Sequence, residues 1–174
     1  MEQVGLMDVT LKSNIIEFSG FLNEFSPIET SIKDLILQTS LNSEPQSVTF
    51  DFCRVKRGNS CGVLCWFKLM DELTFSVKYI NMPIWLVEQF NYVERLPPNT
   101  SILSVQAPFY CPEEDNHENV VLVIGKDIPI QDDYENFTIF CMNQNGAKLE
   151  ANFEPAEYFQ FIVANPGSFV RGQE

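Results

Sequence analysis

Apolar positions in the first 106 residues fall into two alternating patterns, short runs typical of strands and longer stretches at helical spacing. In chain order the predicted elements are strands over 9–11 and 15–18, a helix over about 27–41, a strand over 48–52, a helix after residue 60, a strand over 75–80, a helix starting at 83 and ending before 97, and a strand over 102–105. Alternating strands and helices favour parallel strand pairs joined by right-handed crossovers. Because the first two strands form a hairpin, we expect an α/β fold whose mixed sheet is flanked by helices.

The pattern changes after Val105, where strands without long helices between them follow an acidic run at 113–118. We predict strands over 120–124 and 137–141, a turn at 143–146 and a short helix over 154–162. These elements suit a small C-terminal appendage built on a β-hairpin with a short helix. We therefore expect two units, residues 1–106 and residues 107–174.

The net charge of the chain disfavours some classes of binding partner. The chain has 174 residues and a net charge of −13, with 11 basic and 24 acidic side chains. Such a surface repels nucleic acid and anionic lipid, so we expect neither nucleic acid nor a membrane as a partner. The sequence shows neither a secretory signal nor an apolar run of membrane-spanning length. Its five cysteines are an odd number without disulfide-framework spacing, which predicts reduced thiols in a cytoplasmic protein.

The segment after the strand over 48–52 combines basic residues with a helix start. Arg54, Lys56 and Arg57 precede Asn59-Ser60-Cys61-Gly62, which opens an apolar helix. Two interpretations of the helix start stay open. A polar side chain caps the helix, or the free backbone N–H groups and the helix dipole favour an anion, including a phosphate attached to Ser60. The basic residues are either a solvated loop or contacts for an acidic partner surface or a phosphate.

Three local patterns add to the order of elements. They are Phe18-Ser-Gly-Phe-Leu-Asn23 before the first helix, Val48-Thr-Phe-Asp-Phe52 as a central strand, and Asn59-Ser60-Cys61-Gly62 at the helix start. Together they resemble the STAS domain of bacterial anti-sigma factor antagonists, over residues 1–106. In that family the third pattern is Asp-Ser-Ser-Gly, so Cys61 replaces the second serine here. Asn23 and Asn59 stand where the family often has aspartate.

The resemblance implies a non-enzymatic role in bacterial signalling. A partner kinase, which is itself an anti-sigma factor, phosphorylates the first serine of the loop in that family, and this serine corresponds to Ser60. The partner is then expected to bind around this loop and the helix that follows. The residues expected to contact it are Asn23, Arg54, Lys56, Arg57, Asn59, Cys61 and Gly62.

The last third resembles a zinc ribbon with two incomplete knuckles. Tyr110-Cys111-Pro-Glu-Glu114 and Cys141-Met-Asn-Gln144 each keep the first cysteine of a Cys-x-x-Cys pair. Glu114 and Gln144 occupy the positions of the second cysteines. Two thiolates, one carboxylate and one amide form a poor zinc site, so we expect no metal here. Apolar packing against residues 1–106 must then replace the stabilisation that an ion supplies to such a module.

The sequence leaves two function classes open. One is a protein-interaction domain, and the other is a sensor that binds a small ligand between the sheet and a helix. An enzyme is not expected, because the sequence shows neither a nucleophile–base pair nor a convincing set of metal ligands. No cofactor is expected.

Overall fold

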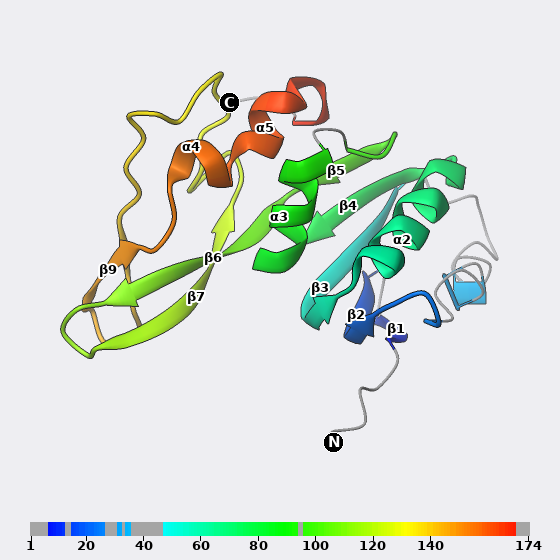
Figure 1. The fold of residues 1–174 in the computed structure, drawn as a ribbon, viewed down its shortest axis with the longest axis horizontal. Helices are drawn as coiled ribbons and strands as arrows, with labels where there is room; N and C mark the ends of the chain where they lie inside the picture. The colour runs from blue at the N-terminus through cyan, green and yellow to red at the C-terminus, as the bar shows by residue number, and fades with distance from the viewer. Residues whose placement is uncertain are drawn as a thin grey trace.

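The computed structural model describes residues 7–12, 15–26, 31–32, 34–35, 47–93 and 96–169. Figure 1 shows a first sheet with helices α2 and α3 lying over it, and a second sheet that extends from the far side of α3. Of the helix predicted over 27–41, residues 31–32 and 34–35 are helical, and the rest of that range lies outside the described residues. Within the described ranges, no helix has both the length and the apolar character needed to cross a bilayer.

The elements alternate as predicted up to residue 102. The strands are β1 (Asp8–Lys12), β2 (Ile15–Leu22), β3 (Ser47–Gly58), β4 (Ser76–Ile80), β5 (Thr100–Ile102), β6 (Ser104–Cys111), β7 (Asn116–Val123), β8 (Cys141–Met142) and β9 (Lys148–Ala151). The helices are α2 (Ser60–Glu72), α3 (Ile84–Val93), α4 (Pro155–Tyr158), α5 (Gln160–Ala164) and the 3-10 turn η1 (Pro166–Ser168).

The described strands of the first sheet run in the order β1-β2-β3-β4-β5. β1 pairs antiparallel with β2, and every later pair is parallel. Antiparallel pairing of two strands adjacent in sequence is the expected hairpin, and the parallel pairs are the ones that need crossover connections. The predicted α/β class with a mixed sheet is confirmed.

Strand β3 is longer than the sequence predicts. Residues 53–58 were expected to form a loop because they carry three basic side chains. Instead they continue the parallel pairing with β2, with irregular register between Glu17 and Ser19 and again between Gly20 and Phe21. These irregularities let Val55 turn into the core, where it is buried, while its charged neighbours stay exposed.

Five aromatic side chains fill the space between the first sheet and its helices, and all five are fully buried. We call this group the aromatic cluster, and its members are Phe18, Phe50, Phe52, Trp66 and Tyr79. The rings of Phe18 and Phe52 stack at 4.8 Å, and both meet the Trp66 indole edge-on at 5.3 and 5.2 Å. The Trp66 N–H donates to the Tyr79 hydroxyl at 3.0 Å, which leaves no buried polar atom of this pair unsatisfied.

Helix α3 covers the same face of the sheet as α2. Its Phe90 ring lies 6.1 Å from Tyr79 of β4 and 5.2 Å from Phe67 of α2. Because a strand side chain points to one face only, these contacts place both helices on one side. α3 thereby extends the aromatic core towards the second sheet (Figure 1).

Strand β6 belongs to the second sheet and contacts the first near its start, through an isolated bridge between Met82 and Val105. Near its start the Gln106 N–H donates to the Met82 carbonyl at 2.8 Å, next to β4. Further along, the same strand pairs antiparallel with β7 and β9, in a second sheet ordered β7-β6-β9-β8 among the described strands. The boundary expected near residue 107 therefore falls inside a continuous strand.

Residues 137–141 differ from the expected strand. Only Cys141–Met142 forms β8, although Ile139 is buried and the Phe137 ring packs 6.1 Å from Phe159. The apolar pattern there reflects packing without strand pairing. The helix expected over 154–162 is likewise divided into α4 and α5, which are separated at Phe159.

Removal of the Tyr79 hydroxyl should test the polar contact within the aromatic cluster. We expect Tyr79→Phe to lower the free energy of unfolding by about 1–3 kcal/mol, because the buried Trp66 N–H loses its acceptor. Tyr92→Phe is the matched control, since Tyr92 is 83% exposed, and should change stability by less than about 0.5 kcal/mol. Urea denaturation of both variants measures the difference, and equal stabilities would contradict the proposed role.

Candidate functional site

Ser60 is the first residue of helix α2 and is exposed, as is Cys61 beside it. The Ser60 hydroxyl makes no hydrogen bond to any residue of the described chain. The capping role belongs to Asn59, whose Oδ1 accepts from the Gly62 N–H at 2.7 Å. Capping and an exposed serine are therefore compatible, because different residues provide them.

The cap also ties α2 to the turn after β2. Asn59 Nδ2 donates to Glu24 Oε2 at 2.8 Å, and the Asn59 N–H donates to the Leu22 carbonyl at 3.0 Å. The pKa of Glu24 lies below its ordinary value, first because its carboxylate accepts its own backbone N–H and second because of the Asn59 amide. The turn thus holds an ionised carboxylate next to the helix start.

Gly62 permits the closest contact at this site. A Cβ atom at this position would lie 2.6 Å from the Asn23 Cα and 2.6 Å from the Leu22 carbonyl oxygen. Both are backbone atoms, so neither can move aside by a rotamer change. A side chain at residue 62 would therefore push α2 away from β2.

Asn23, expected to contact a partner, is 9% exposed, and its side chain stabilises this turn. Its Oδ1 accepts from the Phe25 N–H at 2.9 Å, and the Ser26 hydroxyl lies 3.2 Å from the same oxygen. The Ser26 hydroxyl also donates to the Phe21 carbonyl at 3.1 Å. An asparagine supplies these contacts without the charge of an aspartate.

The three basic residues of β3 have different surroundings. Arg54 forms an ion pair with Glu17 on β2 and lies four residues before Gly58, about 13 Å along a strand. The Arg57 guanidinium lies over the Phe21 ring at 5.1 Å from its centroid. Lys56 is exposed and borders a separate groove near α3.

Exposed apolar side chains accompany Ser60, a feature that the sequence analysis missed. Leu64, one helical turn after Ser60, is 60% exposed, and Phe25 in the neighbouring turn is 75% exposed. Glu24 and Ser26 line one side of a hollow of about 260 Å³ whose other side is α2, so this turn lies along the helix. We call Glu24, Phe25, Ser60, Cys61, Leu64 and Cys65 the Ser60 surface.

The two turns that resemble zinc knuckles lie together in the second sheet. Asn145 Nδ2 donates to Glu114 Oε1 at 2.9 Å. Asn143 Nδ2 lies 3.4 Å from Glu118 Oε1 and 4.0 Å from the sulfur of buried Cys111. Amide groups therefore join the turns directly.

The four positions of the incomplete knuckles have different surroundings. Burial, and then the charge of Asp127, raises the pKa of the Cys141 thiol, which disfavours the thiolate that a metal requires. The pKa of Glu114 is lowered, chiefly by the Asn145 amide, while Gln144 is exposed. Within the described residues, no three His, Cys, Asp or Glu side chains are placed to hold a metal ion.

Comparison with models of known protein families, with curated proteins and with solved structures gave no significant match. Function must therefore be inferred from the geometry of the chain itself.

Gly62→Ala should separate α2 from β2. We expect the free energy of unfolding to fall by about 1–3 kcal/mol, because the added methyl group overlaps backbone atoms on the neighbouring turn. Cys61→Ala changes the adjacent, exposed residue and should cost less than about 0.5 kcal/mol. Urea denaturation compares the two, and an equally mild effect would show that the helix start tolerates a side chain at residue 62.

Asn59→Ala should release Glu24. We expect a loss of about 1 kcal/mol in the free energy of unfolding from the missing cap, and a rise in the pKa of Glu24 because one of the hydrogen bonds to its carboxylate is lost. A lowered pKa stabilises the fold above the carboxyl's ordinary pKa, and this contribution disappears as pH falls through the folded-state value. NMR titration of Glu24 measures the shift, with Glu114 as internal control. An unchanged Glu24 pKa would contradict the Asn59 contact.

Proposed function

We propose that this chain is a non-enzymatic interaction domain of bacterial signalling, similar to the anti-sigma factor antagonists, and that it docks a protein partner through the Ser60 surface. The observation that carries the proposal is an exposed serine at a rigid helix start, flanked by the exposed side chains of Phe25 and Leu64. Apolar side chains held out to water beside a fixed polar group are typical of a protein-binding surface. We place this activity in the cytoplasm.

The order of the strands supports the family assignment. A hairpin followed by three parallel pairs, with α2 starting directly after the central strand β3, is the arrangement that the resemblance implies. Gly62 and Asn59 of the serine loop have clear local roles at the helix start. The loop pattern is thus explained by geometry as well as by resemblance.

Phosphorylation of Ser60 would act mainly by repulsion. A phosphate adds a charge of about −1.5 to −2 near pH 7. Glu24 is ionised next to the helix start, whereas Arg54 is paired with Glu17 and Arg57 covers Phe21. The new charge would therefore disturb an apolar contact with the partner rather than gain a strong local pair.

A small-ligand sensor is the alternative. The space between α2 and the sheet is filled by the aromatic cluster, which favours docking over a ligand at that place. A groove of about 830 Å³ lies elsewhere, beside the bulged part of β3 and the start of α3, and includes Arg54, Trp85 and Gln106. It lies at the carboxyl ends of parallel strands, where ligands often bind in α/β sheets, so a ligand would be expected there.

Partner capture with matched variants tests the docking surface. Immobilised wild-type protein, Ser60→Ala, Ser60→Asp, Leu64→Glu and Val121→Glu would be exposed to lysate of the natural host, followed by mass spectrometry for bound proteins and for phosphate on Ser60. Val121, 45% exposed on β7, is the control for an added charge at an exposed apolar residue.

We expect one partner to be retained by wild type, Ser60→Ala and Val121→Glu. Binding to Leu64→Glu and Ser60→Asp should fall about tenfold or more, because each places a charge inside the contact. A partner lost equally from Val121→Glu would point away from the Ser60 surface. Equal binding by Ser60→Asp and Ser60→Ala would contradict the switch.

A further inference from the structure

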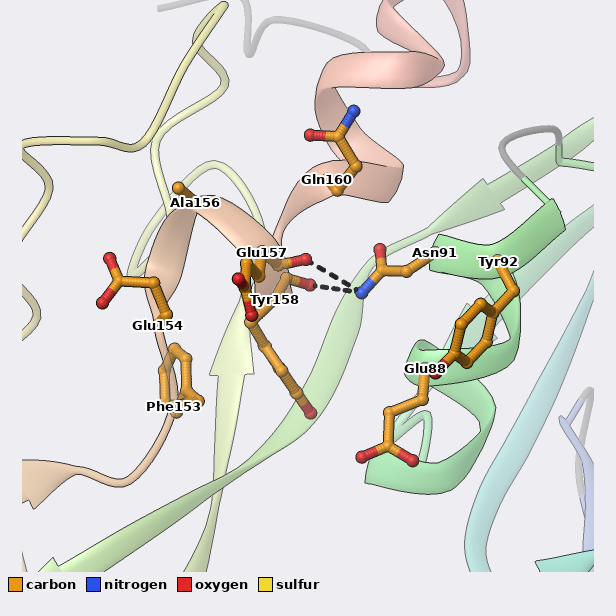
Figure 2. A pocket seen from close by; sticks show the side chains of 9 residues that line it. All are labelled: Glu88, Asn91, Tyr92, Phe153, Glu154, Ala156, Glu157, Tyr158 and Gln160. Carbon is orange, nitrogen blue, oxygen red and sulfur yellow. Dashed lines mark hydrogen bonds between the residues drawn. The ribbon is translucent and has the colours of Figure 1, made fainter.

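A second recognition surface lies between α3 and the pair α4–α5, away from the Ser60 surface. It is a groove of about 580 Å³ whose walls come from segments far apart in the sequence. Figure 2 shows Glu88 and Tyr92 projecting from α3, Glu157 and Tyr158 on α4, and Glu154 just before α4 with its carboxylate directed away from α3. The groove thus exists only because the second sheet and its helices pack against α3.

Asn91 fixes the two walls relative to each other. Its Nδ2 lies 3.1 Å from both the Glu157 and the Tyr158 carbonyl oxygens, and its Oδ1 accepts from the Phe161 N–H at 2.8 Å. Figure 2 shows the bonds from Asn91 to Glu157 and Tyr158 as dashed lines between α3 and α4. Tyr158 is held as well, because its hydroxyl donates to the Gln106 carbonyl of β6 at 2.5 Å. The groove is therefore preformed.

The charge of the groove has one sign. Glu88, Glu154 and Glu157 are exposed, and none of them forms an ion pair within the described part of the chain. No Lys, Arg or His from the described residues lines the groove. Burial, and then the charge of Glu88 on the facing wall, raise the pKa of Tyr158.

Aromatic surface accompanies this charge. Tyr92 is 83% exposed on α3. Phe153 and Tyr158 lie with ring centroids 4.6 Å apart on the opposite wall. Of these rings Tyr92 is the exposed one, and an exposed ring face next to carboxylates binds guanidinium and ammonium groups through both charge and cation–π contact.

We propose that this groove docks a basic segment of a partner protein, with Arg or Lys side chains seated among Glu88, Glu154 and Glu157 and against Tyr92. Charge complementarity selects this occupant, because nucleic acid and anionic lipid carry the same sign as the groove. Two opposed walls suit an extended peptide with several basic side chains. The inference stands on different residues from the Ser60 surface and does not depend on it.

A peptide titration tests the proposal on the whole chain. The probe is a capped nonapeptide with three arginines separated by glycines, and the neutral comparison is the same peptide with citrulline in place of arginine. NMR of the wild-type protein at low ionic strength gives both the affinity and the residues that respond. Spermine is titrated in parallel as a small polyamine.

Two triple variants test whether the carboxylates of the groove, rather than other carboxylates, bind the arginine peptide. The groove variant is Glu88→Gln, Glu154→Gln and Glu157→Gln, which removes charge and keeps side-chain shape. The control is Glu113→Gln, Glu135→Gln and Glu150→Gln, three exposed carboxylates outside the groove. Both variants lose the same number of charges, and circular dichroism checks that both are folded.

We expect the arginine peptide to shift amide signals at 88–92 and 153–160 and the citrulline peptide to shift none. Affinity should fall about tenfold in the groove variant, less than about twofold in the control, and about two- to fivefold in Tyr92→Ala. Raised salt should weaken binding.

Three outcomes would overturn the proposal: equal losses of affinity in both triple variants, no amide shifts that depend on arginine, or amide shifts outside the groove. Spermine binding as tightly as the peptide, with the same shifts, would assign the groove to polyamines instead.

Discussion

Packing of the Trp66 indole between the phenylalanines of β2 and β3 and the Tyr79 ring of β4 is the interaction on which both surfaces depend. It fixes α2 over the central strands and so determines where Ser60 emerges. Through Phe90, the same ring system holds α3, one wall of the acidic groove. Aromatic rings suit this role because they bury large areas and prefer edge-on geometries that set the position of a helix.

Side-chain amides of asparagine form hydrogen bonds between elements at places where apolar packing does not connect them. Asn59 joins a helix start to a turn, Asn91 joins α3 to α4–α5, and Asn145 joins two hairpin turns through Glu114. Asn165 acts similarly, since its Oδ1 accepts from the Leu96 N–H and its Nδ2 donates to the Phe161 carbonyl. An amide offers a donor and an acceptor in one neutral group, so it can satisfy backbone atoms from two elements without burying a charge. In an acidic chain this avoids adding further negative charge at buried contacts.

The spacing of apolar and capping residues predicts the first sheet well. It predicts poorly the features that depend on contacts between residues far apart in the sequence. The hairpin, the parallel strands and the helix start at Ser60 follow from periodicity and capping residues that are adjacent in sequence. The pattern of residues 53–58 indicates a loop, whereas these residues form a strand in which a bulge reverses the usual alternation, so that basic residues flank buried Val55. The pattern of residues 137–140 indicates a strand, because apolar packing without pairing gives the same spacing of apolar residues. The acidic groove left no sequence signal, because Glu88 and Glu157 meet only through tertiary packing.

Within its eight residues, strand β6 pairs with β7 and β9 of the second sheet and also bonds to Met82, two residues after β4 of the first sheet. Loss of either sheet would strip this strand of part of its pairing, and Tyr158 anchors the far helices to the same backbone at Gln106. The two sheets are therefore expected to melt in a single cooperative transition. Domain dissection at residue 106 would cut that shared strand and expose unpaired backbone on both fragments.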